Sequence, residues 1–144
     1  MMLAALMTTS VGISTLVQVP KDAESQKQLH CLATNIYHES RGEPLVGQIA
    51  VAQVTINRVN SPGFQSSICK VVHADKQFSW TSSPKKVKDT KAWNASLAVA
   101  EAVLTKQISI PNFKALYFHT KQVNPKWNRK KEIVAKIGNH IFYT

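Results

Sequence analysis

One of the eight acidic residues in this sequence, Glu39, occupies an unusual place in the predicted pattern. Leu32 and Ile36 precede it at helical spacing, so Glu39 continues the apolar face of a predicted helix instead of its solvent face. A carboxyl group on such a face is poorly solvated, and its pKa should rise. A glutamate protonated near neutral pH can act as a general acid. The alternative is a buried glutamate that pairs with Arg41 or hydrogen-bonds to nearby backbone.

Glycosidases commonly use two carboxylates, one on each side of the scissile bond, and a second candidate is unclear here. Glu43 follows the helix-breaking Gly42 and is expected to pair with Arg41 instead of donating a proton. Four other carboxylates fall in segments with simpler explanations, as loop, cap, helix-surface and strand-edge residues: Asp75, Asp89, Glu101 and Glu132. A single carboxyl favours a lytic transglycosylase mechanism, in which the sugar's own 6-hydroxyl attacks the anomeric carbon.

The histidines and cysteines give no comparable signal. Five histidines are present, but none shows the ligand spacing of a metal site, and His38 with Glu39 does not begin an H-E-x-x-H motif. The sequence contains no glycine-rich phosphate loop and no nucleophile elbow, and a Cys69–His73 pair is a weak nucleophile candidate. We therefore predict neither a metal nor a cofactor.

Aromatic side chains in the last two thirds of the chain suit carbohydrate binding, because their faces can cover the C–H faces of pyranose rings. Strand alternation places Tyr117 and His119 on one face and Phe118 on the other. Trp93 lies in an amphipathic helical stripe and is assigned to the core. The candidates in loop or strand regions are Phe78, Trp80, Tyr117, Phe118 and Trp127. The alternative is that several of these side chains belong to the core.

Hydrophobic periodicity predicts helices followed by a small antiparallel sheet, which is an α+β fold. Ser25 and Gln28 resemble a capping box that opens the first helix. Segment 77–80 reads as a strand or a groove loop. Helices are expected over 25–40, 46–59, 67–73 and 89–106, and strands over 115–119, 132–137 and 140–143.

The chain is strongly basic, with a formal net charge of +10. Such a charge attracts polyanions, including nucleic acid, anionic membranes and envelope polymers. The basic residues carry no nucleic-acid motif, so we expect contact with an anionic envelope surface and no specific nucleic acid. The simpler explanation is two solvated faces. The two clusters are Lys85, Lys86, Lys88 and Lys91, and Lys126, Arg129, Lys130 and Lys131.

Residues 1–19 carry no charged side chain, and as a helix they would reach roughly 28 Å, close to the thickness of a bilayer core. Their serines and threonines make them weakly apolar, which predicts an uncleaved export or signal-anchor segment that could tether the protein to a membrane. Residues 20–28 are the predicted linker and helix start. A signal peptide and a packed N-terminal helix are the alternatives. For Cys31 and Cys69, a disulfide and two free thiols are equally open.

Six sequence blocks, in this order, resemble the SleB-like cell-wall hydrolases, a family that includes spore cortex-lytic enzymes and phage endolysins. The resemblance covers about residues 29–143, and the predicted catalytic domain is 29–144. The blocks are NIYHESRGEP (35–44), GQIAVAQVTINRV (47–59), QFSW (77–80), ALYFHT (115–120), VNPKW (123–127) and IGNHIFY (137–143).

The resemblance implies a lysozyme-like helical domain with a small C-terminal antiparallel sheet. It also implies lytic transglycosylase cleavage of the MurNAc–GlcNAc bond of peptidoglycan. The family's catalytic glutamate is the first Glu of its E-x-R-G-E-P block, which is Glu39 here. Gln48 and Asn57 match family positions and are expected to orient Glu39 or substrate. The full set of predicted substrate-binding residues is Glu43, Gln48, Asn57, Phe78, Trp80, Tyr117, His119 and Trp127.

The blocks QFSW, YFH and GNHIFY are most similar to phage-type members, and spore enzymes usually carry a separate N-terminal binding domain. We therefore expect a monomeric endolysin exported to the periplasm or cell wall of its bacterial host. The rival enzyme is an N-acetylmuramoyl-L-alanine amidase, against which the missing zinc-ligand pattern stands. Two further alternatives are a cationic protein that binds envelope polymers or nucleic acid, and direct membrane permeabilisation. The cleaved bond and the host range stay open.

Overall fold

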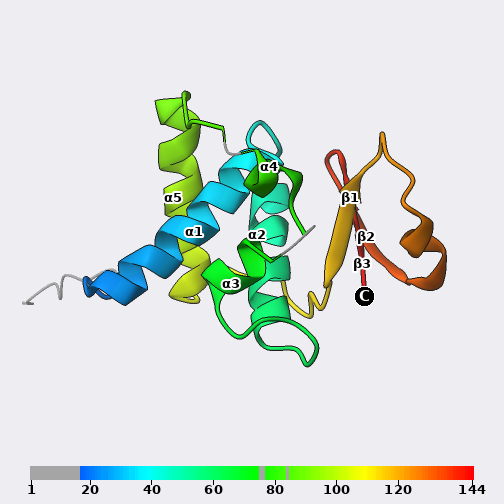
Figure 1. Cartoon of the computed structure of the whole chain (residues 1–144), viewed down its shortest axis with the longest axis horizontal. Coiled ribbons are helices and arrows are strands. Elements are labelled where there is room, and N and C mark those ends of the chain that lie inside the picture. Colours follow the sequence, from blue (N-terminus) through cyan, green and yellow to red (C-terminus); the bar gives the residue numbers. More distant parts are fainter. Residues whose placement is uncertain (1–16, 75–76, 84) are drawn as a thin grey trace, which may run out of the picture.

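The computed structural model describes residues 17–74, 77–83 and 85–144 (Figure 1). Most of the predicted export segment 1–19 and the loop residue Asp75 lie outside the described residues. Among the helices that are described, none combines the length and the apolar character needed to cross a membrane.

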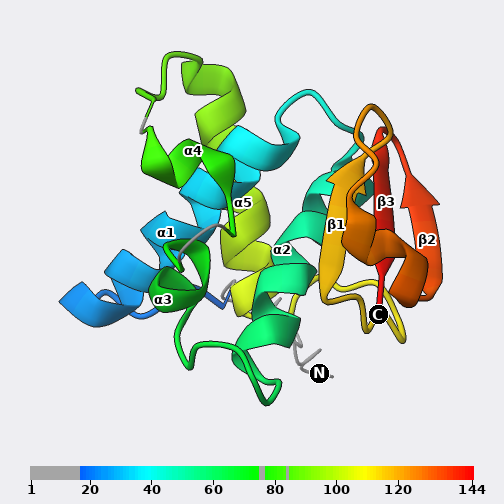
Figure 2. The ribbon, with the colours of Figure 1, turned by 45° about the vertical axis from the view of Figure 1, so that its right-hand side comes forward.

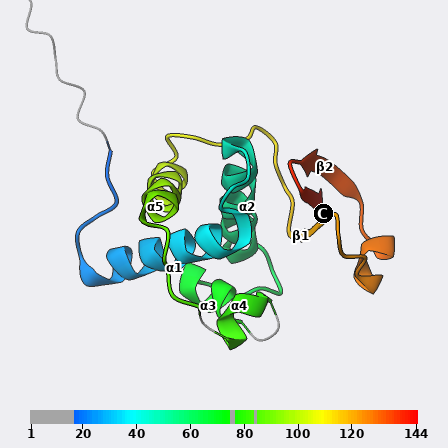
Figure 3. The same ribbon diagram turned by 90° about the horizontal axis from the view of Figure 1, so that it is seen from above.

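Three long helices and two short ones form the first part of the molecule, and all of them except the short helix α4 were predicted. The bounds are α1 Ala23–Ser40, α2 Leu45–Val59, α3 Ile68–Val72, α4 Ser79–Ser82 and α5 Thr90–Leu104. Helix α1 contacts α2, α3 and α5, and Figure 3 shows it running across the other two long helices. The C-terminal end of α1 thereby lies on the side of the helical part that faces the sheet.

The start of α1 differs from its predicted capping box. Asp22 is the N-cap, and its carboxylate accepts a hydrogen bond from the backbone N of Ser25 at 2.9 Å. An aspartate carboxylate at this position satisfies an otherwise unpaired backbone N–H, which is why the helix begins before Ser25. Gln28 instead bonds the Glu24 carboxylate and accepts from the backbone N of Cys69. The capping-box prediction was therefore wrong.

Three short strands form the second part of the molecule (Figure 2). They are β1 Tyr117–Thr120, β2 Ile133–Ile137 and β3 His140–Tyr143, with β3 in the centre and antiparallel to both neighbours. Gly138 in the β2–β3 turn has a φ of +54°, a conformation that favours glycine. The predicted loop between β1 and β2 contains a 3-10 helix, Lys126–Lys130.

Helix α2 is the element shared by the two parts. One face of α2 packs against Phe142 of β3 and against Ala115, which precedes β1. The fully buried residues on this face are Ala50, Val51 and Val54. Another face of α2 packs into the core between the helices. An apolar surface almost all around a helix requires partners on more than one side, and this fixes the sheet relative to α1.

The predicted strand or loop at 77–80 is instead the start of α4. Phe78 is its N-cap residue, and the Phe78 carbonyl accepts bonds from both the backbone N and the hydroxyl of Thr81. Trp80 turns inward, where its indole N–H donates to the Asn35 side-chain oxygen at 3.0 Å. Four residues without a neighbouring strand have no ladder partner, so a helical turn satisfies this backbone better.

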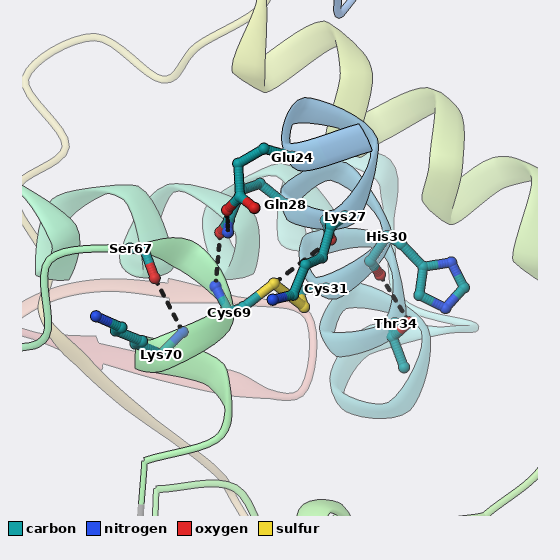
Figure 4. The surroundings of a disulfide bond; sticks show 9 residues. All are labelled: Glu24, Lys27, Gln28, His30, Cys31, Thr34, Ser67, Cys69 and Lys70. Atoms are coloured by element: carbon teal, nitrogen blue, oxygen red, sulfur yellow. Dashed lines mark hydrogen bonds between the residues drawn. A yellow bond between two sulfur atoms is a disulfide. The ribbon is translucent and has the colours of Figure 1, made fainter. Parts of the chain in front are cut away.

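A disulfide joins Cys31 of α1 to Cys69 of α3, which answers the question that the sequence left open (Figure 4). Ser67 caps α3 by accepting a hydrogen bond from the backbone N of Lys70. The bridge holds the five-residue helix α3, too short to be stable alone, against α1. The chain that follows α3 leads directly into segment 77–83.

We predict that Cys31→Ser/Cys69→Ser lowers the free energy of unfolding by about 4 kcal/mol, because the bridge closes a loop of 38 residues in the unfolded chain. Urea unfolding of the oxidised wild type and the double variant measures the difference. The reduced wild type should match the variant. A difference below about 1 kcal/mol would show that α3 does not depend on the bridge.

Candidate active site

Glu39 lies at the C-terminal end of α1, at the edge of a cleft of about 830 Å³ between the helices and the sheet. Arg58 of α2 and the β1 residues Phe118 and His119 line the same cleft. A second hollow of about 490 Å³, lined by Trp80 among others, also includes Glu39. The two hollows share Glu39, so an extended polymer can pass the carboxyl group on both sides.

Burial raises the pKa of Glu39 from its ordinary value of 4.5 to about 7, and the positive charge of Arg58 opposes the shift. The helix-face argument is confirmed in this respect. The alternative, a pair between Glu39 and Arg41, is not formed. The Arg41 guanidinium instead lies 4.6 Å from the centre of the Tyr37 ring. Among the described residues, no hydrogen bond to the Glu39 side chain is present, so the group is free to donate its proton.

Arg58 is a cleft residue that the sequence analysis missed. It is 5% exposed, and its Nε donates to the Leu116 carbonyl at 2.7 Å. Burial lowers the pKa of Arg58 to about 10, which leaves it protonated at neutral pH. Its guanidinium lies within 5.8 Å of the ring centres of Phe78 and Tyr117. The available signal was that Arg58 is the one charged residue of α2.

The sequence predicted that Glu43 pairs with Arg41, and this prediction was wrong. Its carboxylate accepts from the backbone N of Asn139 at 3.2 Å and lies 3.6 Å from Nδ1 of His140. Burial lowers the pKa of His140 more strongly than Glu43 raises it, so this imidazole is neutral near pH 7. A Cβ atom at Gly138 would collide with the Glu43 carboxylate. Glu43 therefore joins the α1–α2 turn to the β2–β3 turn.

Gln48 and Asn57 support the backbone and do not line the cleft. The Gln48 amide donates to the Glu43 carbonyl at 3.0 Å. The Asn57 amide donates to the carbonyls of Phe113 and Ala115 at 3.0 and 2.9 Å. Gln48 thus bonds to the α1–α2 turn and Asn57 to the chain that enters β1, and their expected role in orienting Glu39 or substrate stays a prediction.

His119 lines the cleft, and its hydrogen bonds fix its tautomer. Its Nδ1 lies 2.7 Å from the Thr120 carbonyl oxygen, and its Nε2 lies 2.7 Å from the Tyr143 hydroxyl. A carbonyl oxygen can only accept, so Nδ1 carries the proton and Nε2 accepts from Tyr143. The ring is thus held rigidly at the cleft wall.

The predicted aromatic residues occupy different places. Phe78 is 5% exposed in the cleft wall, and the Trp80 ring stacks on His38 with 4.6 Å between centres. Tyr117 and Trp127 pack against each other with 5.6 Å between ring centres, outside the lining of both hollows. The predicted face of Tyr117 and His119 is nevertheless real, because both rings contact Trp127.

Within the described residues, no group of three or more His, Cys, Asp or Glu side chains is arranged to hold a metal ion. A mainly helical domain with a small antiparallel sheet, and a half-buried glutamate in the cleft between them, has a lysozyme-like architecture. The chain belongs to the cell wall hydrolase family, which it matches over residues 42–143. The match begins just after Glu39, so the assignment of that residue depends on its position in the cleft.

Several relatives are spore enzymes. The spore cortex-lytic enzyme of Bacillus cereus is 34% identical over 119 residues, which cover 82% of this chain and 44% of the relative. The Bacillus subtilis enzyme of the same name is 31% identical over 121 residues, 82% of this chain and 38% of the relative. The chain thus spans less than half the length of these two relatives.

Two solved structures are similar to this fold. The catalytic domain of the germination-specific lytic transglycosylase SleB from Bacillus anthracis has a TM-score of 0.69 and 31% sequence identity. It covers 88% of this chain, and the match includes 100% of that structure. The catalytic domain of Bacillus cereus SleB gives a TM-score of 0.67 at 31% identity, covering 88% of this chain and 95% of that one. The resemblance that the sequence suggested is confirmed.

We predict that the free energy of unfolding of Glu39→Gln, taken relative to that of the wild type at the same pH, rises by about 2 to 3 kcal/mol between pH 4 and pH 8. The wild-type carboxyl ionises near 4.5 when unfolded and near 7 when folded. Between these values the native state holds more protons than the unfolded state, so stability falls with rising pH. The glutamine variant lacks this loss. Urea unfolding at each pH measures the difference, and a constant difference would contradict the raised pKa.

Proposed function

We propose that this domain cleaves the MurNAc–GlcNAc glycosidic bond of peptidoglycan as a lytic transglycosylase, with Glu39 as its single acid/base group. The observation that carries the proposal is the carboxyl of Glu39, whose pKa is about 7 and which lies where two hollows meet. Among the described residues that line these hollows, Glu39 is the one carboxylate.

One carboxyl group is sufficient for the intramolecular reaction. Protonated Glu39 donates its proton to the leaving glycosidic oxygen, and the bond from that oxygen to the muramic C1 breaks. The 6-hydroxyl oxygen of the same muramic acid bonds to C1 and gives a 1,6-anhydro ring. The Glu39 carboxylate then accepts the hydroxyl proton, so the enzyme returns to its starting state and no water is consumed.

Arg58 supports the second half of this cycle. Its charge lowers the pKa of Glu39, which stabilises the carboxylate that exists between the two proton transfers. Buried near the ring centres of Phe78 and Tyr117, the guanidinium cannot move freely toward solvent. The pKa of Glu39 thus stays near 7, where both the acid and the base form are accessible.

The comparisons agree with this reaction, since a solved SleB domain described as a lytic transglycosylase is matched over its full length. The amidase alternative commonly needs a metal-bound water, and the described residues form no metal cluster. The disulfide favours an oxidising compartment, and we therefore propose export to the periplasm or cell wall. The monomeric state and the role in phage lysis stay predictions.

We predict that purified peptidoglycan digested with the wild type releases anhydromuropeptides, and that Glu39→Gln lowers their rate of release about 10³-fold because the proton donor is lost. Mass spectrometry identifies the products. Glu132→Gln is the matched control, because it removes an exposed carboxylate on the sheet edge and should keep full activity. Products with ordinary reducing ends would indicate hydrolysis, and free peptides with intact glycan would indicate an amidase.

We also predict that kcat/KM of the wild type falls about tenfold per pH unit above pH 7, since the protonated fraction of Glu39 falls by that factor. Turbidity loss of peptidoglycan at constant ionic strength measures the profile. A rate that stays constant from pH 6 to pH 9 would show that a protonated Glu39 is not required.

A further inference from the structure

Four basic residues surround a third hollow, of about 420 Å³, beside the second one. We call Arg41, Lys85, Lys86 and Lys88 the cationic site. All four side chains are exposed, whereas Tyr37, which completes the lining, is 2% exposed. The site therefore consists of a buried aromatic floor with positive charge around its rim.

Tyr37 fixes the position of these cations. Its hydroxyl accepts hydrogen bonds from the backbone N of Lys88 at 3.2 Å and of Asp89 at 3.1 Å. The face of its ring contacts the Arg41 guanidinium. The Tyr37 side chain thus holds the loop before α5 against the end of α1. This contact brings the lysines of the loop close to Arg41.

In the described part of the chain, no acidic side chain forms a salt bridge with the four members of the cationic site. The neighbouring Asp89 uses its carboxylate to cap α5, accepting from the backbone N of Ala92 at 3.0 Å. Like charges gathered in this way repel one another, and a bound anion relieves that repulsion.

The cationic site continues into the cleft. Arg41 and Lys85 also line the hollow that contains Glu39 and Trp80. The pKa of His38, in the same wall, is lowered by burial and then by the charges of Arg41 and Lys85. A polymer bound past Glu39 therefore meets positive charge at this end of the groove.

We propose that the cationic site binds the carboxylate groups of the peptide stem carried by a muramic acid of the bound strand. This inference rests on the proposed function, since it takes the strand in the cleft to be peptidoglycan. The stem branches from the glycan and carries free carboxylates, which match the planar fork of Arg41. Continuity with the cleft favours the stem over a separate phosphodiester polymer of the envelope.

The test measures binding in a Glu39→Gln background, so that it does not depend on which bond is cleaved. Soluble glycan strands with their peptide stems, and the same strands after the stems are removed, are titrated by isothermal calorimetry at low salt. We expect the stem-bearing strands to bind about tenfold more tightly. Adding Arg41→Gln/Lys85→Gln should abolish this preference, and high salt should reduce it.

Arg129→Gln/Lys130→Gln is the matched control. It removes two exposed charges from the other basic cluster and should keep the tenfold preference. Equal binding of both strands by the Glu39→Gln protein, or an equal loss in both double variants, would overturn the proposal. A preference that appears with a purified phosphodiester polymer instead of the stems would also overturn it. Wrong products from the active wild type would count against the proposed function alone.

Discussion

The removal of the Glu39 carboxyl from water is the constraint on which the proposed chemistry depends. A surface glutamate would be ionised near neutral pH and could not donate a proton to a glycosidic oxygen. Here the end of α1 carries the group into the cleft between helices and sheet, and burial raises its pKa to about 7. The same burial lowers stability as pH rises from about 4.5 to about 7, so function and stability are opposed at this residue.

The cleft holds its shape through polar side chains that contact backbone instead of substrate. Asn57 and Arg58 on α2 bind carbonyls of the chain that leads into β1. The Glu43 carboxylate accepts a hydrogen bond from the backbone N of Asn139 in the β2–β3 turn. Buried polar groups need partners, and each of these bonds joins the helical part to the sheet. The distance between Glu39 and the opposite wall is therefore set by hydrogen bonds as well as by packing.

Local signals predicted most of the fold. Asp89 before an amphipathic stripe gave α5 correctly, and Gly138-Asn139 between alternating residues gave the β2–β3 hairpin. The spacing of Leu32, Ile36 and Glu39 was enough to predict that the Glu39 carboxyl is withdrawn from solvent and has a raised pKa. Each of these patterns lies within one element or two adjacent elements, so no knowledge of the tertiary structure was needed.

Features that depend on distant segments were not predictable in the same way. The cleft position of Arg58 exists because Leu116, far along the chain, provides its carbonyl partner. Glu43 has a nearby arginine in sequence but a turn 96 residues away as its partner in the fold. The cysteines gave no indication of pairing because their contact depends on how α3 docks on α1. The six sequence blocks indicated the family and its fold, but they did not predict which residues of these segments contact one another.

The most direct test of the account is the pKa of Glu39 itself. Selective ¹³C labelling of glutamate, with Glu39→Gln to assign the signal, allows the side-chain carboxyl carbon to be followed by NMR from pH 4 to pH 9. We expect a midpoint near 7, set by burial against the opposing charge of Arg58. A midpoint near 4.5 would show an ordinary solvated glutamate and contradict its role as proton donor.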